Sequence, residues 1–63
     1  MKIYVVLYQN LWLEVCKVSQ EGYRTLTEAQ AFCLGRVDIK QRNDYEFYNI
    51  ATQENYTIVE VSI

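Results

Sequence analysis

Apolar and polar residues follow two different periods along this chain of 63 residues. Period-two runs predict strands over residues 2–8, 11–18, 45–50 and 56–63, because successive side chains of a strand point to opposite faces of a sheet. Between the second and third runs, apolar residues recur at the three- and four-residue spacing of a helix. The predicted order is therefore strand, strand, helix, strand, strand.

Thr25 and Glu28 mark the start of the helix. They fit a capping box, in which the Thr25 side chain accepts from the Glu28 N–H and the Glu28 carboxylate bonds back to the Thr25 N–H. Gly35 makes the end of the helix ambiguous, because a glycine can end a helix or lie inside one at a cost of about 1 kcal/mol relative to alanine. Val37 continues the apolar stripe, so we expect the helix to reach about residue 39 or 41. A helix shortened at Gly35 is the alternative.

These elements predict an α+β fold in a single domain, residues 1–63, because a chain of this length has room for one core. The order is ββαββ, with a four-stranded antiparallel sheet and one helix packed on one face; a sheet divided between two chains is the alternative. We assign the core to one face of the strands and to the apolar stripe of the helix. The strand residues are Ile3, Val5, Leu7, Leu13, Val15, Phe47, Val59 and Val61, and the helix residues are Leu26, Ala29, Phe32 and Cys33.

The first strand is apolar on both of its faces, which a chain this short has difficulty covering. Its single helix covers one face, and little of the chain remains for the other. We therefore expect the uncovered side chains to form a protein interface, and above all the interface of a homodimer. The predicted interface residues are Tyr4, Val6, Tyr8, Trp12 and Tyr48. A face for a different protein, and tyrosines that are simply half-exposed to water, are the alternatives.

The composition argues against an enzyme and against a bound cofactor. The chain has no histidine, which is the most frequent general acid or base in catalysis. Its two cysteines, Cys16 and Cys33, make no zinc pattern, and no secretory signal precedes them. No run of 18 apolar residues is present, so no membrane span is predicted. We therefore expect a cytoplasmic protein with free thiols, without metal, cofactor or catalytic residues.

A single-stranded nucleic-acid-binding protein is the alternative function. Some sheets stack bases on exposed aromatic side chains and carry basic residues at the rim. Tyr4, Tyr8, Tyr48 and Trp12 are candidates for such a platform. The basic candidates follow the predicted helix: Arg36, Lys40 and Arg42. A net charge of −2 argues against this function, because binding to a phosphate backbone depends on positive charge.

Three segments resemble the small standalone proteins that phages and prophages encode: residues 2–6, 25–29 and 45–50. Such proteins are often inhibitors that bind a host defence or housekeeping enzyme, commonly as dimers. The resemblance implies a binding role without catalysis, with a second copy of the chain and an unidentified host protein as partners. Inhibition of an anti-phage defence protein would then be steric, by occupation of a site on the target.

Overall fold

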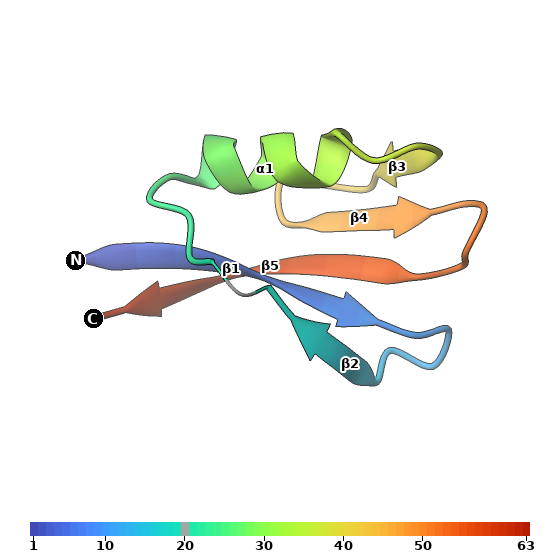
Figure 1. Ribbon diagram of the computed structural model, residues 1–63, viewed down its shortest axis with the longest axis horizontal. Helices are drawn as coiled ribbons and strands as arrows, with labels where there is room; N and C mark the ends of the chain where they lie inside the picture. Colours follow the sequence, from blue (N-terminus) through green and yellow to red (C-terminus); the bar gives the residue numbers. More distant parts are fainter. Residues whose placement is uncertain (20) are drawn as a thin grey trace.

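The computed structural model describes residues 1–19 and 21–63. The elements, in chain order, are β1 (Lys2–Gln9), β2 (Val15–Val18), α1 (Leu26–Leu34), β3 (Ile39–Gln41), β4 (Glu46–Asn49) and β5 (Asn55–Ser62). The strands form one antiparallel sheet in the order β2-β1-β5-β4-β3, and α1 lies along one side of it (Figure 1). The predicted α+β class with one helix on one face is confirmed. The four-stranded ββαββ sheet is wrong, because β3 adds a fifth strand.

The first and last strands are neighbours at the centre of the sheet. β1 and β5 pair over their whole length, from Lys2 opposite Ser62 to Gln9 opposite Asn55. In this register Val6 lies opposite Ile58, and all residues of the same parity share their face of the sheet. The β1–β5 register therefore decides which side chains of these two strands meet the helix.

The buried core lies between α1 and the face of the sheet that carries Val6. Its members are Val6, Tyr8, Ala29, Cys33, Phe47, Tyr56 and Ile58. Ala29, Cys33 and Phe47 were predicted here, and the predicted Leu26 and Phe32 pack against this cluster. The predicted faces of the two central strands are wrong. Five assigned core residues lie on the other side of the sheet and are only half-buried: Ile3, Val5, Leu7, Val59 and Val61.

A pair of aromatic rings explains why the helix covers this face. Tyr8 lies directly opposite Tyr56, and their rings meet edge to face with centroids 5.3 Å apart. Buried aromatic side chains remove more apolar surface from water than valines do, and such ring pairs add about 0.5–1.5 kcal/mol. Covering Tyr8 and Tyr56 therefore stabilises the monomer more than covering Val5 and Val59 would.

The start of α1 follows the capping prediction in part. Thr25 is the N-cap, and its Oγ1 accepts from the Glu28 N–H at 3.1 Å. The Glu28 carboxylate, however, accepts from the Arg24 N–H at 3.3 Å, one residue before the expected donor. The first hydrogen bond of the predicted box is confirmed, and the return bond is shifted by one residue.

The helix ends at Gly35, so its predicted extension to residue 39 or 41 is wrong. Gly35 is the C-cap, and its N–H donates to the Ala31 carbonyl at 3.0 Å. Val37 is 79% exposed, and Asp38 reverses the chain with a φ of 62°. The chain then returns as β3, where Ile39 packs against the core and pairs with Asn49. A short strand thus packs a partly buried Ile39 against the core and supplies β4 with a second hydrogen-bonded neighbour.

Candidate functional site

The side of the sheet that α1 leaves uncovered is apolar across its two central strands. Ile3 lies opposite Val61, Val5 opposite Val59 and Leu7 opposite both Thr57 and Val18. The helix lies on the other side, over the core, so it leaves these residues uncovered, and Gly22 lies against Ile3 at one end (Figure 1). We call this surface the open face; it comprises Ile3, Val5, Leu7, Val18, Thr57, Val59 and Val61.

Polar groups are few at the centre of the open face. Its one hydroxyl, on Thr57, donates to the side-chain oxygen of Gln9 within the same chain. The charged residues of this side lie near the sheet edge: Lys40 on β3, Glu46 on β4, and Arg42 over the Tyr48 ring. The centre of the open face can therefore be covered without leaving a charge unpaired.

The structure does not bring the five predicted interface residues onto one surface. Val6 and Tyr8 belong to the buried core beneath α1, and Tyr4 packs against that core from the same side. Tyr48 lies on the opposite side of the sheet, one position along from the buried Phe47. Trp12 lies outside the sheet, in the loop between β1 and β2. The prediction that the helix leaves Tyr4, Val6 and Tyr8 uncovered is wrong, because α1 lies over that face of β1.

Tyr4 lies at the end of the helix-covered face, beside charged neighbours. Its hydroxyl donates to the Glu60 carboxylate at 3.3 Å, and Glu60 also forms an ion pair with Lys2 at 3.3 Å. Burial and the Glu60 charge raise the pKa of Tyr4. This tyrosine therefore remains neutral at physiological pH and serves to join β1 to β5.

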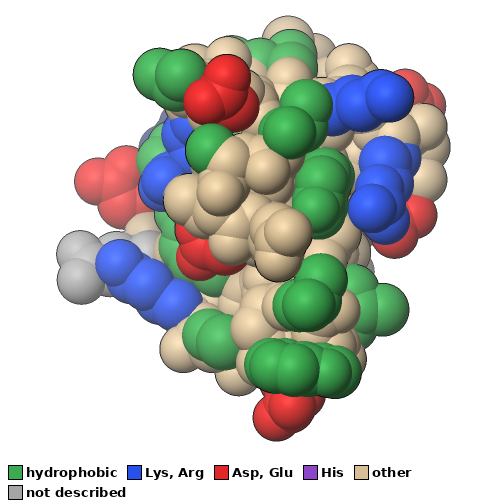
Figure 2. Space-filling model, turned by 90° about the vertical axis from the view of Figure 1, so that its right-hand side faces the viewer, with side chains coloured by type: hydrophobic (Ala, Val, Ile, Leu, Met, Phe, Trp, Pro, Cys, Tyr) green, Lys and Arg blue, Asp and Glu red, His purple; other side chains and the backbone are tan. Residues whose placement is uncertain are grey.

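A hydrophobic loop projects from the end of the sheet between β1 and β2. Trp12 is 75% exposed, and Leu11 and Leu13 beside it are more than half exposed. Figure 2 shows hydrophobic side chains gathered in the lower part of this end of the molecule, and Figure 1 places the β1–β2 connection at the same height. We call residues 10–14 the Trp12 loop. The strand predicted over residues 11–18 is wrong in its first half, because β2 begins only at Val15.

Hydrogen bonds to Asn10 stabilise the backbone of the Trp12 loop. The Asn10 side-chain oxygen accepts from the N–H groups of Trp12 and Glu14, at 2.9 and 3.0 Å. Its backbone bonds to Glu14 and to Leu13, and Leu13 adopts a φ of 62°. A leucine with positive φ is strained, and this network is what maintains it. The loop therefore presents Trp12 on a preorganised backbone.

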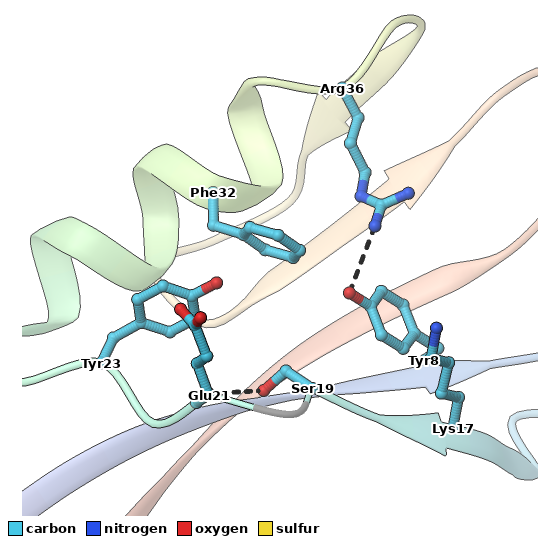
Figure 3. Close-up of a pocket in the computed structure, with 7 residues that line it drawn as sticks. All are labelled: Tyr8, Lys17, Ser19, Glu21, Tyr23, Phe32 and Arg36. Carbon is cyan, nitrogen blue, oxygen red and sulfur yellow. Dashed lines mark hydrogen bonds between the residues drawn. The ribbon is translucent and has the colours of Figure 1, made fainter.

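A groove separates α1 from β2 on the helix side of the sheet. Seven residues line its first part, a cavity of about 420 Å³: Tyr8, Lys17, Ser19, Glu21, Tyr23, Phe32 and Arg36. Figure 3 shows Arg36 reaching from the end of α1 towards Tyr8, while Glu21 and Tyr23 lie at the other end and Phe32 lies between. A second part, of about 310 Å³, shares Tyr8, Lys17 and Arg36 and continues to Glu54 and Tyr56. We call the two parts together the groove.

Aromatic rings hold the Arg36 guanidinium in place. Its carbon lies 5.1–5.3 Å from the centroids of Phe32, Tyr8 and Tyr56, and one of its nitrogens donates to the Tyr8 hydroxyl at 3.2 Å. Lys17 brings a second positive charge 5.7 Å from the Tyr8 ring. Burial and the Glu21 charge raise the pKa of Tyr23, so this ring of the groove is neutral at physiological pH. The sequence reasoning missed this site, because its parts are scattered along the chain.

The basic cluster predicted after the helix is not formed. Arg36 stacks on Tyr8 on the helix side, whereas Arg42 stacks on Tyr48, 5.0 Å from its ring centroid, on the other side. Lys40 pairs with Tyr48 across β3 and β4. The predicted aromatic platform is divided in the same way, since Tyr4 and Tyr8 lie beneath the helix and Tyr48 does not. The predicted aromatic and basic residues are therefore divided between the two faces of the sheet and form no single platform.

The two cysteines differ in their surroundings. Both are free; Cys16 is exposed and Cys33 is buried in the core. Burial raises the pKa of the Cys33 thiol to about 11, against a small lowering by Arg36. The described residues contain no cluster of three or more side chains suited to hold a metal ion.

Because the pKa of Cys33 is raised, we expect the free energy of unfolding to fall at alkaline pH. An unfolded thiol ionises near pH 9, whereas the folded Cys33 keeps its proton up to about pH 11, so the folded state binds more protons in this interval. The contribution is fully present below pH 9 and falls by up to about 2–3 kcal/mol as the pH rises to 11. Urea unfolding across this range measures it. Cys33→Ala should flatten this part of the profile and Cys16→Ala should not; equal profiles for both variants would contradict the assignment.

Comparison of the chain with models of protein families, with curated proteins and with solved structures found no match. The single helix in the described part of the chain has nine residues and is too short to cross a membrane.

Proposed function

We propose that the chain is a non-catalytic protein-interaction module that forms a homodimer through its open face. The observation that carries the proposal is the apolar sheet surface of Ile3, Val5, Leu7, Val59 and Val61, which α1 does not cover. These five side chains are half-buried rather than fully exposed, and a contiguous apolar surface that remains in contact with water is typical of an interaction site. Its removal from water stabilises association by about 25 cal/mol for each Å² buried.

The composition of the open face favours a second copy of the chain over a different partner. It consists of valine, isoleucine, leucine and one threonine, as the inner face of a β-sandwich does. Obligate homodimer interfaces resemble a domain core divided in two, whereas exchangeable interfaces are richer in Tyr, Trp and Arg. The aromatic and arginine side chains of this protein lie mostly elsewhere, in the core, the groove and the Trp12 loop.

Charge does not oppose this self-association. In a two-fold symmetric dimer each surface meets its own copy, so a charge at the centre would face the same charge. The centre of the open face is uncharged, and Lys40 and Glu46 at its edge can pair with each other across the symmetry axis. Sedimentation equilibrium tests the proposal: a dimer has twice the 7.5 kDa mass of one chain. A mass of 7.5 kDa at all concentrations would refute it.

The Trp12 loop supports a second candidate function, binding to a different protein. Tryptophan is enriched among the residues that dominate binding energies, and a preorganised loop loses little entropy when it binds. Trp12 is the only tryptophan and is 75% exposed. A steric inhibitor that uses this loop would place Trp12 in an apolar pocket of its target, and the dimer would display two such loops.

Fluorescence quenching of Trp12 tests whether the loop is free for such a partner. We expect a soluble quencher such as acrylamide to reach Trp12 equally well in the dimer and in the monomer, because the loop lies outside the open face. Measurements at rising protein concentration compare the two states. Protection of Trp12 as the dimer forms would instead assign the loop to the interface between copies.

A further inference from the structure

The groove between α1 and β2 holds two positive charges, on Lys17 and Arg36, that form no ion pair with a carboxylate of the described residues. In the described part of the chain the one ion pair is Lys2 with Glu60, so neither Arg36 nor Lys17 takes part in one. A guanidinium has five N–H donors, and one hydrogen bond of Arg36 is present, to the Tyr8 hydroxyl. The remaining donors of a side chain held by three rings are thus available to an anion.

We propose that the groove binds a mononucleotide, with its phosphate between Arg36 and Lys17 and its base against Tyr23 and Phe32. Arginine and lysine are the usual phosphate ligands in proteins, and arginine adds a bidentate geometry. The proposal is independent of the open face, which lies on the other side of the sheet.

The aromatic end of the groove provides the surface for the base. The rings of Tyr23 and Phe32 lie 5.5 Å apart at a tilt of 35° and form a wall beside the charged end (Figure 3). Bases stack on such rings with a gain of about 1–3 kcal/mol each. The first part of the groove, about 420 Å³, lies within the range of roughly 300–1,000 Å³ for small-molecule sites.

Two carboxylates limit the ligand to a single nucleotide. Glu21 lines only the first part of the groove and Glu54 only the second, while Lys17 and Arg36 line both. The positive charges therefore lie between two negative ones, and the phosphates of a longer strand would meet Glu21 or Glu54. For a single nucleotide the Glu21 carboxylate is instead useful, because it can accept hydrogen bonds from ribose hydroxyls.

Titration of the isotopically labelled protein with adenosine monophosphate, followed by nuclear magnetic resonance, tests this site. We expect shifts at Tyr8, Lys17, Tyr23, Phe32 and Arg36. Lys17→Gln and Arg36→Gln should each raise Kd about tenfold, the effect of losing one charge-assisted hydrogen bond. Lys40→Gln, on the other side of the sheet, is the matched control and should bind as the parent does. Lys17 is exposed, so this variant keeps the test valid if Arg36→Gln disturbs the core.

Three further ligands separate the parts of the proposal. Adenosine should bind more weakly than the monophosphate, and inorganic phosphate should shift the charged end of the groove alone. Equal affinity for inorganic phosphate and the nucleotide would overturn the role of the aromatic wall. Tighter binding of a short single-stranded oligonucleotide would overturn the restriction to one nucleotide. No shifts with millimolar nucleotide, or equal Kd values for the parent and Lys17→Gln, would overturn the site itself.

Discussion

Replacing Val6 by lysine is expected to unfold the protein. Val6 is completely buried between the sheet and α1, and nothing in the surrounding core can pair with an ammonium group. An unpaired buried charge costs at least several kcal/mol, whereas a domain of this size has a total stability of about 3–9 kcal/mol. Far-ultraviolet circular dichroism and the dispersion of amide resonances measure the loss of structure.

A milder substitution at Val6 measures how much its buried side chain contributes to the free energy of unfolding. Val6→Ala should lower the free energy of unfolding by about 2 kcal/mol, the value of a buried valine side chain that is cut back. Val5→Ala is the matched control, because the same residue type one position earlier is only half-buried on the open face. At a concentration where the chain is monomeric, Val5→Ala should cost clearly less. A larger loss at Val5 than at Val6 would mean that the helix covers the other face.

The same lysine substitution at Val5 is expected to leave the chain folded and to separate the dimer. Val5 lies opposite Val59 at the centre of the open face, so two copies of the new charge would meet near the two-fold axis. Burying these charges without partners costs about 3–5 kcal/mol, which weakens association by more than a hundredfold. In the monomer the lysine reaches water freely. Sedimentation velocity should therefore show a folded monomer at concentrations where the parent protein is a dimer.

Val37→Lys is the control for the effect of charge alone. Val37 is 79% exposed in the connection between α1 and β3, away from the open face. This variant carries the same change in net charge and should remain dimeric. A dimer that survives Val5→Lys, or one that Val37→Lys dissociates equally, would place the interface elsewhere.

The sequence predicts the strands of the sheet far better than it predicts the covered face. Three of the predicted strands differ from β1, β4 and β5 by a single residue at their ends. Alternation divides β1 into two sets of side chains, and both sets are apolar enough to lie in a core. The choice between them depends on the β1–β5 register and on the Tyr8–Tyr56 contact, which join residues far apart in the chain. The alternation of residues along one strand reveals neither the register nor this contact. The predicted interface was therefore assigned to the face that is buried.

The end of the helix shows a second limit of local reasoning. Val37 and Ile39 continue the helical pattern of apolar residues, yet Ile39 reaches the core from β3. The helix ends at Gly35, which was the predicted alternative. The longer helix was predicted because apolar residues continue beyond Gly35, but a short strand can also carry such residues. The groove is less predictable still, because Tyr8, Lys17, Tyr23, Phe32 and Arg36 meet only after β2 and α1 pack beside each other.

Contacts between copies at the open face test the central claim most directly. A sample mixed from labelled and unlabelled chains reports, through isotope-filtered nuclear Overhauser effects, only contacts between different molecules. The proposed dimer predicts such contacts among the methyl groups of Ile3, Val5, Val59 and Val61, which point away from the helix. Intermolecular contacts confined to other surfaces, or none at concentrations where the parent protein sediments as a dimer, would contradict it.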